Sequence, residues 1–158
     1  MTTLLTLILV FSLLALIAGA VKRVPDGQVH SVYRHGKPQR LLPSGTHLVL
    51  PWLDRVGHRI DLGGQVLRFE EPMADAHDLR GTVYWQVLEP ERADAVIEQA
   101  DQLIRGGALA ALREEPEADH ADLSHVDCRD LGTRLKQAMN KVLRERGMMV
   151  TRVELDFA

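Results

Sequence analysis

The sequence predicts an α+β protein, with an N-terminal transmembrane helix, then a small antiparallel β-sheet region, then helices and a final strand. Three observations support this prediction. An uncharged apolar run opens the chain, short alternating segments separated by turn residues follow it, and apolar residues recur at helical spacing after Pro90. Strands this short and this regularly separated are typical of an antiparallel sheet and not of alternating β-α-β units. We expect an anchor at residues 1–23 and one domain at residues 24–158.

Residues 4–21 form an apolar run that is long enough to cross a membrane. As a helix, such a run extends about 27 Å, close to the ~30 Å of bilayer hydrocarbon. Its apolar side chains include those of Leu4, Leu7, Phe11, Leu14, Ile17 and Val21. The alternative is a cleaved signal peptide, with small residues at 18–20 as the cleavage site and an exported soluble binding domain as the product. We favour the anchor because no Lys or Arg precedes the run, and because the run is longer than a usual signal core.

Charge is distributed unevenly behind this run. Lys22 and Arg23 follow it directly, so the positive-inside rule predicts a cytoplasmic domain at the cell (inner) membrane, with the periplasmic orientation as the alternative. Residues 22–68 hold eight Lys and Arg against three Asp and Glu, whereas residues 69–158 hold eleven against nineteen. A basic segment next to a membrane span favours membrane lipid as a partner, although solvated Arg and Lys on strands would give the same count.

Five short strands are predicted between residues 28 and 88. Turn sequences separate them, such as GKP at residues 36–38 and PSG at residues 43–45. In the third strand apolar and polar side chains alternate, which indicates one buried face. The five strands are expected at residues 28–34, 46–50, 55–61, 66–70 and 82–88.

Helical spacing begins after these strands. Pro90 is tolerated in a first helical turn, and apolar residues then recur at helical spacing to Leu112. A kink or break is expected at Gly106-Gly107, and an acidic loop is expected at residues 114–121.

The clearest helix is predicted at residues 130–146. Its apolar stripe consists of Leu131, Leu135, Ala138, Met139, Val142 and Leu143. Gly147 suits the left-handed end of such a helix. Residues 152–157 then alternate between polar and apolar side chains, which predicts a half-buried final strand.

Six stretches of the sequence carry motifs in a fixed order. They are VKRVPDGQ at 21–28, YRHGK at 33–37, LPSGTHLVLPWLDRV at 42–56, RIDL at 59–62, VYWQV at 83–87 and GMMVTRVELD at 147–156. In this order they resemble the SPFH / band 7 superfamily of stomatins, prohibitins, flotillins and bacterial protease regulators, and in particular a stomatin-like bacterial member. The sequence departs from the family pattern at Ser44, which separates the usual Pro and Gly, at residues 59–62, which lack a final Arg, and at residues 71–78, which replace a K-D-x-V stretch.

This resemblance implies a non-enzymatic, single-pass, membrane-anchored scaffold. Such a scaffold would organise local lipid or partner membrane proteins, for example membrane proteases or small β-barrel membrane proteins, in membrane protein quality control. Homo-oligomers or hetero-oligomers with other band 7 proteins are also implied, and no nucleic acid is expected as a partner. Family members usually continue into a long Ala/Glu-rich coiled-coil helix that joins subunits into rings. That helix would begin at Ala158, where this chain ends, so large rings are the expectation with the least support.

No catalytic site is expected. The motifs G-x-S-x-G, G-x-x-x-x-G-K-[ST] and G-x-G-x-x-G are all missing from the sequence, and we expect no cofactor. The best metal candidates are His120, His125 and Cys128, because imidazoles and thiolates are zinc ligands. Their spacing matches no familiar metal signature, and acidic segments before helices usually supply helix caps. We therefore expect no metal site, with a zinc-dependent hydrolase as the weaker alternative.

The strongest binding hypothesis is a membrane-surface set of four cations and one tryptophan. The set comprises Lys22, Arg23, Trp52, Arg55 and Arg59. Trp52 has apolar neighbours, and Trp is favoured at the membrane interface. The simpler interpretation packs Trp52 into the core at the end of a strand.

Overall fold

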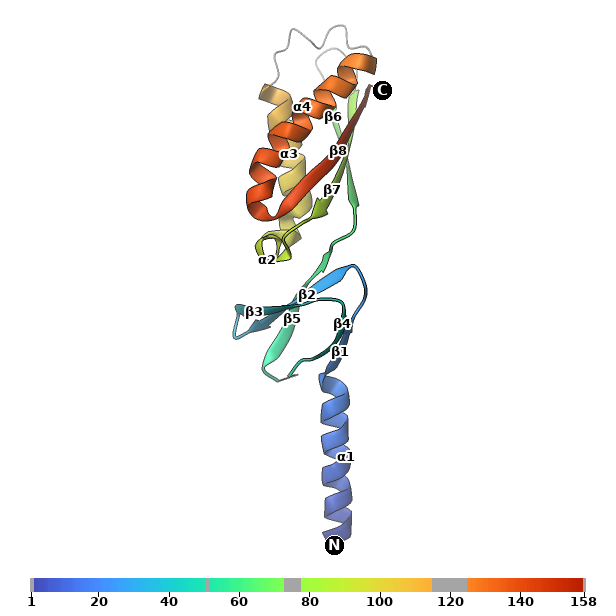
Figure 1. The fold of residues 1–158 in the computed structure, drawn as a ribbon, viewed down its shortest axis with the longest axis vertical. Coiled ribbons are helices and arrows are strands. Elements are labelled where there is room, and N and C mark those ends of the chain that lie inside the picture. Colours follow the sequence, from blue (N-terminus) through green and yellow to red (C-terminus); the bar gives the residue numbers. More distant parts are fainter. Residues whose placement is uncertain (1, 51, 73–77, 115–124, 158) are drawn as a thin grey trace. The chain divides into compact units, whose positions relative to one another are not determined.

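The structure is a computed structural model whose contacts divide the chain into two compact units, Met1–Asp61 and Leu62–Ala158. The described residues are 2–50, 52–72, 78–114 and 125–157. Figure 1 shows the order of the elements, with an N-terminal helix, seven strands, a helical region and the final strand. This α+β architecture is the one that the sequence predicts.

The first unit joins a long apolar helix to two small antiparallel sheets (Figure 1). Helix α1 spans Thr2–Ala20, and strand β1 (Val21–Val24) follows it directly. The strand orders are β1-β4 and β3-β2-β5. The other strands are β2 (Gln28–Arg34), β3 (Lys37–Leu42), β4 (Gly45–Leu48) and β5 (Asp54–Asp61). The contacts group α1 with these sheets, and the proposed division between an anchor at 1–23 and a domain at 24–158 stays a prediction.

A small apolar core holds the strands of the first unit together. Its buried side chains are Val24, Val32, Leu42 and Val49. Ile60 of β5 is also fully buried, whereas Arg55 and Arg59 on the opposite face are exposed. The alternation predicted for residues 55–61 is thereby confirmed.

The second unit packs helices against a three-stranded antiparallel sheet of order β6-β7-β8. Its long elements are β6 (Gln65–Pro72), β7 (Asp78–Val87), α3 (Ala100–Glu114), α4 (His125–Leu143) and β8 (Met148–Phe157). A short helix α2 (Pro90–Ala93) follows β7, and Gly147 joins α4 to β8 with a left-handed φ of 73°. Figure 1 shows α3 and α4 side by side along the sheet, and α4 packs against β8. Buried side chains in this unit include Leu79, Val83, Ile104, Leu131, Leu135, Met148 and Val150.

Helix α4 covers the open edge of β8. The Asn140 side chain donates to the Val150 carbonyl at 3.0 Å and accepts from the Val150 N–H at 2.8 Å, as a neighbouring strand would. Further along, a Cβ at Gly132 would lie 2.8 Å from the Val153 carbonyl oxygen, so only glycine allows this approach. An uncovered strand edge can pair with other chains, and α4 therefore protects β8 from such pairing.

All five predicted strands are present, with bounds that shift by up to a few residues. Two strands were not predicted. Strand β3 contains Pro38, which a central strand would exclude, but β3 lies at the edge of its sheet, where Pro is tolerated. Strand β1 is only four residues long and pairs with β4, a contact that local sequence does not indicate.

Three expectations about the helices are wrong. Helix α3 runs through Gly106 and Gly107 without a break, because its face with Ile104 and Ala108 is buried, and this burial outweighs the cost of about 1 kcal/mol per glycine. Helix α4 begins at His125, before residue 130. Val142 is 59% exposed and so lies outside the buried stripe. Most of the expected acidic loop, residues 115–121, lies outside the described residues.

Candidate functional site

The segment between β4 and β5 carries the most exposed large apolar side chain that the structure describes. We call residues 49–53 the Trp52 loop, in which Pro51 lies outside the described residues. Trp52 is 88% exposed, and Leu50 and Leu53 are about half exposed. Packing of Trp52 in the core is therefore wrong, because buried Val49 takes the inward position and the loop turns outward after it.

The Trp52 loop starts beside the end of helix α1. The Val49 N–H donates a hydrogen bond of 2.8 Å to the carbonyl of Ala20, the last residue of α1. Strands β1 and β4 pair next to this bond, with Val21 opposite Leu48. The Leu48 side chain is also exposed, so the apolar surface continues from the end of α1 into the loop.

A buried carboxylate fixes the backbone of the Trp52 loop. Asp54 accepts a hydrogen bond from Arg34 at 2.8 Å and one from the Leu50 N–H at 3.3 Å. The Leu50 carbonyl in turn accepts from the N–H groups of Leu53 and Asp54, at 3.2 and 2.8 Å. The Arg34 hydrogen bond is the main reason that the pKa of Asp54 lies below its ordinary value of 3.8. The loop is thus a closed turn that directs Trp52 outward.

Four exposed cations accompany this loop in the first unit. Lys22 and Arg23 lie on β1, directly after α1, and Arg55 follows the loop on β5. Arg59 lies four residues further along β5, about 13 Å away at the usual rise of a strand. Within the described part of the chain, none of the four forms an ion pair. Lys22 and Arg23 therefore lie next to the end of α1, and Arg55 lies next to the end of the Trp52 loop. Arg59 lies further from the loop along β5.

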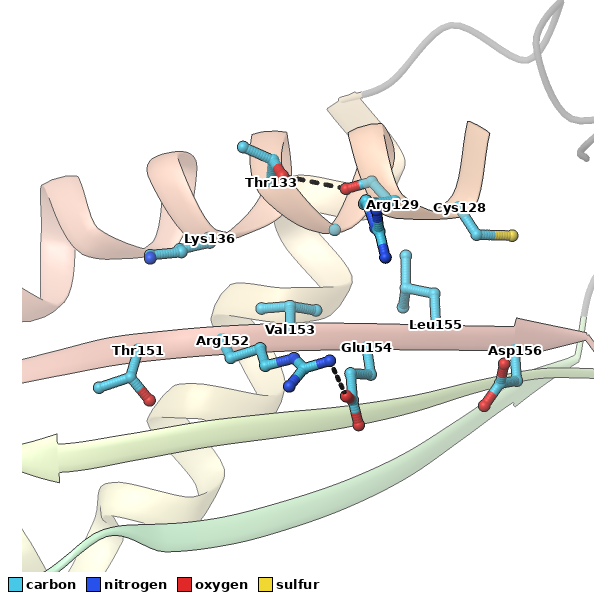
Figure 2. Close-up of a pocket in the computed structure, with 11 residues that line it drawn as sticks. Cys128, Arg129, Thr133, Lys136, Thr151, Arg152, Val153, Glu154, Leu155 and Asp156 are labelled. Atoms are coloured by element: carbon cyan, nitrogen blue, oxygen red, sulfur yellow. Dashed lines mark hydrogen bonds and ion pairs between the residues drawn. The ribbon is translucent and has the colours of Figure 1, made fainter. Parts of the chain in front are cut away.

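The metal candidates lie in or near a different region. His120 is outside the described residues, as is the side chain of His125. Cys128 is buried and lines a hollow of about 540 Å³ between α4 and β8 (Figure 2). Among the side chains that the structure describes, no group of three His, Cys, Asp or Glu could hold a metal ion. The hollow has mixed charge, since Arg152 pairs with Glu154 at 2.6 Å, and so it indicates no particular ligand.

The comparison with protein families decides the identity of the fold. A sequence model of the SPFH domain / Band 7 family matches residues 22–156, a range that begins after α1 and includes the three sheets and helices α2 to α4. The chain belongs to the SPFH domain / Band 7 family. A band 7 domain indicates a membrane-associated role of the scaffold type in general, and members of the family are generally non-enzymatic.

The band 7 domain follows an apolar helix that is compatible with membrane anchoring. Residues Thr3–Ala20 have a mean hydropathy of 2.5, and by length and composition this helix can cross a membrane. Because it lies near the N-terminus, a signal sequence would pass the same test. The alternative of a cleaved segment therefore stays open.

A known protein is similar in sequence to this band 7 chain over most of the chain's length. The chain is 28% identical to an uncharacterized protein of Schizosaccharomyces pombe, in an alignment that covers 85% of this chain and 40% of that protein. The chain thus spans less than half the length of the relative.

Two residues that fix the Trp52 loop, Asp54 and Arg34, are not identified by the sequence alone. Asp54 belongs to the P-x-x-D-x-V motif, but the motif alone does not reveal that its carboxylate closes the Trp52 loop. Arg34 lies 20 positions away in the sequence, and only strand pairing brings it to Asp54. The sequence gives one indication of the role of Asp54, because it is a single acidic residue in an otherwise apolar and basic segment.

Proposed function

We propose that this band 7 protein is a non-enzymatic scaffold, anchored in the cell (inner) membrane by α1, which organises partner membrane proteins and local lipid. The observation that carries the proposal is the hydrogen bond between Val49 and Ala20, at the junction of the Trp52 loop and α1. If α1 spans the bilayer, this bond holds the loop at the depth of the headgroups, where Trp is favoured.

Lipid contact then follows from side-chain chemistry. Each exposed Leu of the loop would gain up to about 1.5–3 kcal/mol on full burial in the membrane. Lys22, Arg23 and Arg55 would each add roughly 1 kcal/mol near anionic headgroups. The positive charges after α1 favour the cytoplasmic side for the band 7 domain.

The second unit is proposed to contact the protein partners. Residues 69–158 carry nineteen Asp and Glu against eleven Lys and Arg, so they suit partners with basic surfaces. Membrane proteases and small β-barrel membrane proteins are the partner classes that we propose, in membrane protein quality control. Homo-oligomers or mixed oligomers with other band 7 proteins belong to the same proposal.

The test is the native mass of the full-length protein, extracted in mild detergent from its own host, with co-purifying proteins identified. A defined complex with one or more membrane proteins is expected. If only lipid and detergent accompany a monomer, even after cross-linking in the intact membrane, the scaffold proposal is wrong. Asp26→Asn, an exposed substitution between β1 and β2, is a matched control that should leave the complex unchanged.

A further inference from the structure

A hollow of about 510 Å³ opens beside the Trp52 loop. Its walls come from the ends of β2 and β5 and from the turn between β2 and β3. The side chains that matter for its chemistry are Tyr33, His35, Trp52, Arg55 and His58, and Gly57 also lines it. The hollow lies entirely within the first unit, next to the loop that is hydrogen-bonded to the end of α1.

The backbone at one wall of the hollow adopts an uncommon conformation. His35 has φ 52° and Gly36 has φ 77°, so both residues of the β2–β3 turn are left-handed. Such a turn matches the twist of a hairpin, but a side chain at the first position is normally Asn, Asp or Gly. His, like Asn and Asp, is enriched in the left-handed region, so this turn accommodates an imidazole at the rim of the hollow.

A second wall is shaped by a missing side chain. A Cβ at Gly57 would lie 2.6 Å from a carbon of the Tyr33 ring, so glycine lets this ring lie against β5. The Tyr33 ring also meets His58 edge to face, with ring centroids 5.6 Å apart and planes at 77°. The aromatic wall is therefore built by close packing and is not an accident of one exposed side chain.

Among the described residues that line this hollow, Arg55 is the one cation and Asp54 is the one carboxylate. Asp54 is already bonded by Arg34 and the Leu50 N–H, so the charge of Arg55 is left uncompensated. Arg55 is exposed and forms no ion pair with any residue in the described part of the chain. A guanidinium with the neighbouring His35 imidazole suits a phosphate group, which Arg can bind through two parallel hydrogen bonds.

The rim of the hollow is apolar where Trp52 and Leu53 border it. A free phosphate would gain nothing from this rim, whereas a phospholipid joins its phosphate through one glycerol unit to apolar acyl chains that can contact the rim. We propose that the hollow binds the phosphate-bearing headgroup of an anionic phospholipid, with the start of the acyl region against Trp52. This inference rests on the proposed function, since it requires that α1 anchors the chain in a membrane.

The experiment uses the full chain in mild detergent, supplied with equal amounts of phosphatidylglycerol and phosphatidylcholine. Native mass spectrometry counts the lipids of each kind that the chain retains. We expect wild type to prefer phosphatidylglycerol and Arg55→Gln to lower this preference about tenfold, as the loss of a charge-assisted contact predicts. His35→Asn, which tolerates the left-handed turn, should lower it in the same direction. Circular dichroism checks that both variants fold.

Arg59→Gln is the matched control, because it removes the same charge from the same strand outside the hollow. If Arg59→Gln lowers the preference as much as Arg55→Gln, only general surface charge acts and the proposal is wrong. Added glycerol 3-phosphate distinguishes the two sources of phosphate. If glycerol 3-phosphate displaces the lipid only weakly, the hollow is a lipid site. If glycerol 3-phosphate binds as tightly as the lipid, the proposal of a lipid site is wrong. None of these outcomes tests whether partner proteins co-purify, so a failure here is separate from a failure of the scaffold proposal.

Discussion

At the scale of single residues, Asp54 links three parts of the first unit. Its carboxylate bonds Arg34 of β2 and the Leu50 N–H of the Trp52 loop, and it lies 4.0 Å from Arg40 of β3. Arg40 also donates to the Leu48 carbonyl at 2.6 Å, so the end of β4 is tied to the same cluster. A carboxylate in this position has no neutral substitute that keeps all of these contacts.

We predict that Asp54→Asn lowers the thermal midpoint of the full chain in detergent at neutral pH, because Asn keeps the shape but loses the charge-assisted bond with Arg34. In the folded protein the pKa of Asp54 lies below 3.8, so its stabilising contribution is present above pH 3.8 and is lost as pH falls through the lowered value. Melts by circular dichroism across this acid range should show a steeper loss for wild type than for the variant. Equal slopes would contradict the prediction, and exposed Asp26→Asn is the control.

Trp52 provides the residue-scale test of membrane contact. Trp52→Ala should leave the fold intact, because the side chain is 88% exposed, and should weaken binding of residues 22–158 to anionic vesicles about tenfold or more. Flotation of the isolated segment with vesicles measures this binding. Val142→Ala removes another exposed apolar side chain, in the second unit, and should leave binding unchanged. Unchanged binding for a folded Trp52→Ala chain would discard the interface role.

At the scale of elements, the packing of α4 against β8 depends on the absence of a side chain. Gly132→Ala places a Cβ against the Val153 carbonyl, which is backbone and cannot rotate away. We expect this substitution to destabilise the protein by about 1–3 kcal/mol, the usual range for overpacking. Denaturant unfolding of the full chain followed by circular dichroism measures the change.

Gly106→Ala is the matched control for this prediction, since a Cβ at that position in α3 meets no atom within 4 Å apart from its chain neighbours and the adjoining backbone of its own helix. It should stabilise the protein by about 0.5–1 kcal/mol through helix propensity alone. If both glycines respond alike, then close approach to β8 is not what requires Gly132.

At the scale of the whole molecule, we predict that α1 holds the protein at the membrane. Deletion of residues 2–21 should release the chain to the soluble fraction of host cells, because the apolar run is lost and only surface contacts remain. Cell fractionation with a salt wash measures the outcome, and retention at the membrane in high salt would contradict the anchor. The N-terminal residue of the mature full-length chain separates anchoring from cleavage near Ala20, since cleavage would leave an exported binding domain.

Much of the fold could be read from local patterns. The alternation in β5 and β8 and the stripe of Leu131, Leu135 and Met139 each repeat within one segment, so they predict which face is buried. The errors arose where packing overrides local preference. Helix α3 tolerates Gly106 and Gly107, and β3 tolerates Pro38 at a sheet edge.

The candidate site was predictable only in part. Its basic residues and Trp52 are visible in the sequence, since charge and amphipathic side chains next to an apolar run are local features. The exposure of Trp52 could not be predicted from the sequence, because this exposure depends on Val49 filling the core and on Asp54 closing the turn. The hollow beside Trp52 likewise needs Tyr33 and Gly57 from different strands.

The sequence by itself determined the apolar N-terminal helix, the order of strands and helices, and the motifs of the band 7 family, because each of these is encoded by neighbouring residues. Only the tertiary structure decided that the Trp52 loop meets the end of α1, that Asp54 receives Arg34, and that α4 covers the edge of β8. These contacts join residues about 10 to 30 positions apart, and pairing at that distance follows from strand register and packing, which no local pattern specifies.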